Sequence, residues 1–200
     1  MDGFLALIFR ALRRARGSIL AVAIVYFLAV LTGGVMVHTG SSFALQYRDI
    51  VVQDAQAGTV LTQPDPLRMA LADFQGNLVG ATTDTLGGLG VVFPFPLVAY
   101  RGWVGGIVSV DGSHASRLAD LQSAAYYIST LLLQLSGYTL AAGAGVNVGL
   151  SLWWARPYSA GDKWLGMPKE ALRDLLRIYA LVIPILLIAS LWEFLSPLNF

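Results

Sequence analysis

The sequence has no cysteine and only two histidines, His38 and His114, among its 200 residues. Without cysteine there are no disulfides, no thiol chemistry and no cysteine metal ligands. The two histidines are far apart, in segments that we expect to be loops. We therefore expect neither a metal site nor a cofactor.

Charge is also scarce, and the recurring catalytic patterns are missing. Only 12% of residues are charged, about half the usual share in a soluble domain. There is no basic stripe interleaved with aromatic residues, which argues against a nucleic-acid partner. No H-E-x-x-H, G-x-S-x-G or P-loop pattern occurs. We therefore assign no catalytic residues and expect no enzymatic activity, and a membrane enzyme is the least favoured hypothesis.

Apolar residues, in contrast, make up 56% of the chain and form long runs. Residues 18–37 hold no charged side chain and are long enough to cross a bilayer as a helix. The composition predicts an all-α fold, a polytopic transmembrane helical bundle of about five spans, as a single domain over residues 1–200 in contact with the lipid bilayer.

Breaks in the hydrophobic pattern divide the chain. Residues 1–17 are a basic, amphipathic start, with an interfacial helix and a solvated lead-in to the first span as the two interpretations. We expect the polar segment 38–67 to be an extracytoplasmic loop, irregular apart from a short interfacial helix, and 155–169 to be a cytoplasmic loop. The FPFP motif predicts a broken helix near 93–97. The spans that we expect lie at about 18–37, 67–93, 97–110, 118–154 and 178–195.

The basic residues predict an orientation. If the N-terminus is cytoplasmic, ten Lys and Arg fall inside and only Arg48, Arg68 and Arg117 fall outside, as the positive-inside rule favours. The inside set is Arg10, Arg13, Arg14, Arg16, Arg101, Arg156, Lys163, Lys169, Arg173 and Arg177. We expect a multi-pass protein of the cell membrane. Residues 97–110 are short for a span, and a re-entrant segment there would change the number of crossings.

Small residues recur at four-residue spacing on the expected spans. Such rows let helix backbones approach closely in a membrane. They serve either packing within one chain or a homodimer face, and both interpretations stay open. The rows are Gly76 and Gly80; Gly102 and Gly106; and Ala141, Gly145 and Gly149.

Polar residues inside membrane segments are costly and are candidates for function. The ionisable ones are Asp73, Asp84 and Glu193, and we expect Asp84 near the bilayer midplane. Its role is either structural pairing or proton- or ion-linked chemistry. The uncharged candidates are Asn77, Gln134 and Asn147, for which interhelical hydrogen bonding is the favoured role.

Several stretches resemble the stage II sporulation protein M family of integral membrane proteins. They are FQGNLVGATTDTLGGLG, RGWVGG, LAAGAGVNVG and LRIYALVIPILLIASLWEFLSP, the last ending in the Glu193, Phe194, Ser196 and Pro197 run typical of the family. Members often carry a Pro-His-Gly…Glu-Leu-Pro stretch, whose His, Glu and second Pro fall here on Thr130, Gln134 and Ser136.

The resemblance implies a bundle of five to six helices and no enzymatic activity. In spore formers such proteins belong to a membrane complex for engulfment and septal wall remodelling. We therefore expect a non-catalytic membrane subunit that acts as a scaffold and binds other membrane subunits, with a second copy of itself among the candidate partners. The alternative is a transporter or channel with a polar path around Asp84, beside the break near 93–97.

Overall fold

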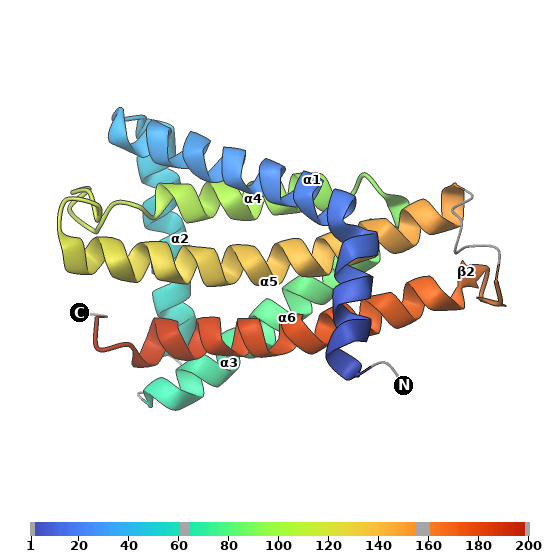
Figure 1. The fold of residues 1–200 in the computed structure, drawn as a ribbon. Helices are drawn as coiled ribbons and strands as arrows, with labels where there is room; N and C mark the ends of the chain where they lie inside the picture. Colours follow the sequence, from blue (N-terminus) through green and yellow to red (C-terminus); the bar gives the residue numbers. More distant parts are fainter. Residues whose placement is uncertain (1–2, 61–64, 155–160, 199–200) are drawn as a thin grey trace.

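A computed structural model describes residues 3–60, 65–154 and 161–198. Over this part of the chain the fold is all-helical, as the composition predicts, with six α-helices and one short antiparallel hairpin (Figure 1). The elements are α1 (Phe4–His38), α2 (Ser42–Val60), α3 (Pro66–Gly87), the 3₁₀ turn η1 (Gly88–Gly90), α4 (Pro94–Ile107), α5 (Leu121–Trp153), β1 (Lys163–Trp164), β2 (Met167–Pro168) and α6 (Lys169–Leu195).

Three of these helices, α1, α5 and α6, are long and apolar enough to cross a membrane. Their composition leaves apolar side chains on the outside of the bundle, such as Phe27, Leu132 and Ile188, because lipid is as apolar as these side chains. The chain is therefore a membrane protein. The five spans expected from the sequence are not established by this criterion, because α3 is too polar and α4 too short to meet it.

Contacts between the helices fix their directions. α4 runs parallel to α1, because Gly102 meets the backbone of Tyr26 and Gly106 that of Val30. α3 runs antiparallel to α6, since Asp73 bonds Ser190 whereas Thr85 bonds Tyr179. α5 is also antiparallel to α6, with Gln134 at Glu193 and Gly137 at Leu186. α5 is antiparallel to α1 as well, because Gly143 meets Ile19, whereas Leu131 meets Gly105, which lies beside Val30. The direction therefore alternates along α1, α3, α4, α5 and α6.

The bundle has two ends, which we name by residues found there. The His38 end holds the end of α1 and the 108–118 loop, where His38 Nε2 lies 2.9 Å from Ser116 Oγ. The Arg14 end holds η1, the end of α5 and the start of α6. Figure 1 shows α5 between the α1–α4 and α3–α6 sides, α2 crossing the bundle towards the His38 end, and the dark blue start of α1 crossing α5 and α6.

The helical structure is interrupted between α3 and α4, and this interruption begins five residues before the position expected from the sequence. α3 ends at Gly87, and the reversal runs through η1 to Val91, whose φ of 63° is rare for a β-branched residue. Pro94 then begins α4, because proline fits the first helical turn, whose amides need no helical partner. The FPFP motif therefore starts a helix, and the expected break near 93–97 lies at 88–93.

Two segments expected to be loops contain regular structure. A 19-residue helix, α2, occupies most of 38–67. Its aromatic residues pack on α4. The ring centres of Tyr47 and Trp103 are 5.1 Å apart, and the hydroxyls of Tyr47 and Tyr100 form a hydrogen bond of 3.0 Å. Of the expected loop 155–169, residues 155–160 lie outside the described residues, and the remainder forms the β1–β2 hairpin.

Candidate functional site

A connected set of polar side chains joins α3, α4, α5 and α6, and we call it the polar core. Its members are Asp73, Asn77, Asp84, Arg101, Tyr138 and Ser190. Ser190 donates to Asp73 Oδ2 at 2.6 Å, and the Asn77 amide donates to the same oxygen at 2.7 Å. A carboxylate of α3 is thereby tied to α6 near the His38 end.

The polar core continues from Asn77 to Asp84. The Tyr138 hydroxyl donates to Asn77 Oδ1 at 2.6 Å, and the Arg101 guanidinium lies 4.4 Å from the Tyr138 ring centre. Arg101 Nε donates to Asp84 Oδ2 at 3.2 Å. Gly80 makes room for Arg101, because a Cβ there would overlap the guanidinium. The α3–α4 contact is thus an ion pair inside the bundle, which lowers the cost of both charges.

Asp84 is fully buried, at 0% exposure, and its second oxygen, Oδ1, has no hydrogen-bond partner. Along α3 the residue lies towards the Arg14 end. Its neighbour Thr85 lies 2.7 Å from the Tyr179 hydroxyl, and Tyr179 comes only two residues after the ion-paired Arg177. Because α3 begins at Pro66 and ends at Gly87, Asp84 is in its last turn rather than at its middle.

Gln134 and Glu193 form a second contact near the His38 end. The Gln134 amide donates to Glu193 Oε2 at 3.0 Å, and the Tyr126 hydroxyl donates to the Glu193 backbone oxygen at 2.7 Å. These bonds join α5 to α6.

Asn147 is separated from this group. It is buried on α5 between Gly145 and Gly149, beside η1 at the Arg14 end, and its backbone oxygen accepts a bond from Ser151. The structure therefore brings together five of the six polar candidates in neighbouring contacts and leaves Asn147 at one end of the bundle.

The small-residue rows differ in what they face. Gly102 and Gly106 lie against the backbone of α1, and Gly145 and Gly149 against Thr85 and Gly88. Ala141 is fully buried, and its backbone oxygen accepts a bond from Thr85. Gly76 faces open space and Gly80 faces Arg101. These contacts place two rows at close helix–helix approaches within the chain.

Three members of the polar core, Arg101, Tyr138 and Ser190, were missing from the sequence-derived candidates. We counted Arg101 on the cytoplasmic side, but it lies within α4 and pairs with Asp84. A signal was available, because Arg101 is the only charged residue in 97–110. A lone cation in a membrane segment requires a counter-ion on a neighbouring helix.

A second ionic group, the ion-pair cluster, holds the start of α1 on α6. It consists of Arg14, Glu170, Asp174 and Arg177. Arg14 donates to both carboxylate oxygens of Asp174 and lies 3.0 Å from Glu170. Arg177 lies 2.8 Å from each of the two acids. The Asp174 side chain is 0% exposed, so this carboxylate is a buried anion held by two arginines.

The His38 end carries ionic contacts on α2 and the 108–118 loop. Arg48 donates to Asp49 at 2.9 Å, and His114 Nε2 lies 3.1 Å from the same carboxylate. The Arg48 hydrogen bond, followed by that of His114, lowers the pKa of Asp49 from its ordinary value. These contacts join α2 to the loop.

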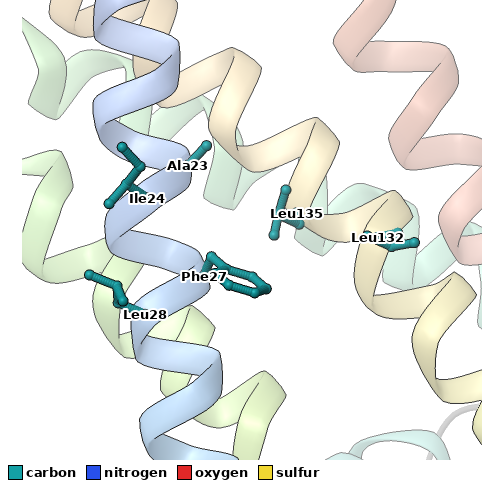
Figure 2. A pocket seen from close by; sticks show the side chains of 6 residues that line it. All are labelled: Ala23, Ile24, Phe27, Leu28, Leu132 and Leu135. Atoms are coloured by element: carbon teal, nitrogen blue, oxygen red, sulfur yellow. The ribbon is translucent and has the colours of Figure 1, made fainter.

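The best-formed hollows in the described part of the molecule are open grooves on its apolar outside. One is lined by Ala23, Ile24, Phe27, Leu28, Leu132 and Leu135. Figure 2 shows Phe27 of α1 directed towards Leu135 of α5. The other is formed by the end of α6 around Trp192 and Pro197. Neither groove reaches the polar core.

A comparison with protein families agrees with this arrangement. The family model for stage II sporulation protein M matches residues 22–197, which include the polar core and the helices that carry it. The chain belongs to the stage II sporulation protein M family. The match includes the Glu193–Pro197 run, whose Glu193 bonds α5. No curated protein and no solved structure matches the chain.

Membership of the stage II sporulation protein M family accounts for the apolar helices and the membrane setting. The family match covers only part of the ion-pair cluster. Asp174 and Arg177 lie inside the matched region, whereas Arg14 precedes it. The contact between the start of α1 and α6 therefore joins matched and unmatched parts of the chain.

Proposed function

We propose that this member of the stage II sporulation protein M family is a five-span subunit of the cell membrane, with a cytoplasmic N-terminus. Its role is that of a non-catalytic scaffold that binds other membrane subunits. The alternating directions of α1, α3, α4, α5 and α6 support five crossings. With the Arg14 end inside, the N-terminal arginines and the charged start of α6 are cytoplasmic, as the positive-inside rule favours.

One observation carries the scaffold proposal. The polar side chains of the polar core are bonded to one another across four helices, while the best-formed hollows are apolar and open outwards. Side chains that bond one another hold helices in place. Outward apolar grooves offer packing surface to lipid or to another helix, because association in membranes depends on close packing.

Crosslinking tests the scaffold proposal. A photoreactive residue at Leu132, which lines the groove and is 55% exposed, is expected to crosslink to a discrete membrane partner when the chain is expressed at native level. The same residue at Leu186, which is fully buried, is the control and is expected to give no partner adduct. Adducts to lipid alone from Leu132, with no subunit recovered in mild detergent, would contradict the proposal.

The unpartnered Oδ1 of Asp84 favours a second candidate, a transporter that binds a proton or cation there. The scaffold proposal predicts that liposomes containing the protein show no more proton or cation flux than empty ones. Asp84→Asn should then change nothing, and the exposed Asp162→Asn serves as control. Flux that Asp84→Asn abolishes and Asp162→Asn leaves intact would establish the transporter instead.

A further inference from the structure

The start of α1 presents an unusual stripe of residues to its surroundings. Phe9, Arg13, Arg16 and Leu20 follow one another at spacings of four, three and four, so they lie on one side of the helix. All four are exposed, Phe9 at 68% and Leu20 at 61%. Two cations are therefore bracketed by apolar side chains.

The arginines of this segment differ in what they contact. Arg14 is directed inwards and bonded to Asp174 and Glu170, which fixes the segment on α6. Arg13 and Arg16 lie on the exposed side. No Asp or Glu occurs between residues 3 and 48, so α1 supplies no anion of its own to them.

The path of the helix sets the orientation of this stripe. Figure 1 shows the dark blue start of α1 crossing α5 and α6, while the rest of the helix runs along α4. A helix that crosses the bundle axis lies along the membrane surface when the bundle stands upright in the membrane. Phe9 and Leu20 then reach hydrocarbon, and the arginine heads between them stay at the depth of the lipid head groups.

We propose that Arg13 and Arg16 bind the phosphate groups of anionic phospholipids, with Phe9 and Leu20 inserted beside the same lipids. A guanidinium suits this ligand, because its planar set of donors matches two phosphate oxygens. Zwitterionic lipids offer the same acyl chains without net charge, so selectivity rests on the two arginines. The assignment is independent of the scaffold role.

The test uses the full chain in detergent, titrated with phosphatidylglycerol or with phosphatidylcholine of the same acyl chains. The thermal unfolding temperature is the readout. Phosphatidylglycerol is expected to raise it at lower concentration than phosphatidylcholine. Arg13→Gln with Arg16→Gln should weaken the apparent affinity for phosphatidylglycerol by about fivefold for each arginine.

Arg68→Gln is the matched control, because Arg68 is also an exposed arginine but lies at the beginning of α3, near the His38 end. It should keep the wild-type response. A wild-type response to phosphatidylglycerol that survives 0.5 M salt, equal stabilisation by the two lipids, or an unchanged response of the double variant would each overturn the proposal. The salt titration of the wild type decides the question even if the double variant folds poorly.

Discussion

Replacing Asp174 by Asn should lower the free energy of unfolding by about 3 kcal/mol, since breaking a buried ion pair leaves charges without compensation. The Asp174 carboxylate is fully buried and binds Arg14 and Arg177. An amide keeps the shape and removes the negative charge, so Glu170 alone would face both arginines. Because Arg14 is 29% exposed, water screens part of the loss, and we expect the lower end of the usual range.

The measurement is thermal unfolding of the detergent-solubilised protein, where this loss corresponds to a decrease on the order of 10 °C. Asp162→Asn is the matched control. Asp162 makes the same kind of ion pair with Lys169 at 3.1 Å, but its side chain is 83% exposed. Exposed pairs contribute at most about 1 kcal/mol. Equal effects of the two variants would show that the ion-pair cluster does not hold α1 on α6.

Replacing Gly106 by Ala should destabilise the protein by about 2 kcal/mol, because adding a methyl to a packed contact without space costs roughly 1–3 kcal/mol. A Cβ at this position would overlap the Val30 backbone oxygen and lie 2.8 Å from the Gly34 nitrogen. Both are backbone atoms, which do not move aside as a flexible side chain does. The two helices would have to separate, and α4 is short and depends on α1 for its packing.

Gly76→Ala is the control for Gly106→Ala, and its effect on the free energy of unfolding should not be a decrease. No atom lies within 4 Å of a Cβ placed at Gly76, so there is no steric cost. Alanine is preferred over glycine in a helix by up to about 1 kcal/mol. Unfolding in denaturant should thus show Gly106→Ala less stable, and Gly76→Ala no less stable, than the wild type. Loss of stability in Gly76→Ala would point to an interface between copies on α3.

The sequence predicted the apolar helices well because the period and length of hydrophobic runs are local properties. The run at 18–37 forms most of α1, and the long segment from 118 forms α5. The helical content of 38–67 was underestimated, because the polar residues of α2 do not form the apolar run of a membrane span. Its helix is held by aromatic contacts to Tyr100 and Trp103, which lie more than fifty residues further along the chain.

The candidate site was only partly predictable, for a similar reason. Asp73, Asn77 and Asp84 were identified individually, since polar residues in a membrane segment are costly. Their partners lie on other helices: Ser190 on α6, Tyr138 on α5 and Arg101 on α4. A single sequence does not say which helices are neighbours. Asp174 was missed as a buried group because the charged segment KEALRDLLR has the pattern of a surface helix.

Cysteine accessibility tests the proposed five-span topology most directly, because the chain has no native cysteine. Ser113 lies in the loop at the His38 end, whereas Val92 in the turn between α3 and α4 and Lys163 in the hairpin lie near the Arg14 end, and all three are exposed. In intact cells an impermeant thiol reagent is expected to label Ser113→Cys, and to label Val92→Cys and Lys163→Cys only after the membrane is opened. Labelling of Val92→Cys from outside would mean that α3 and α4 do not cross, and protection of Ser113→Cys or labelling of Lys163→Cys in intact cells would likewise contradict five crossings with a cytoplasmic N-terminus.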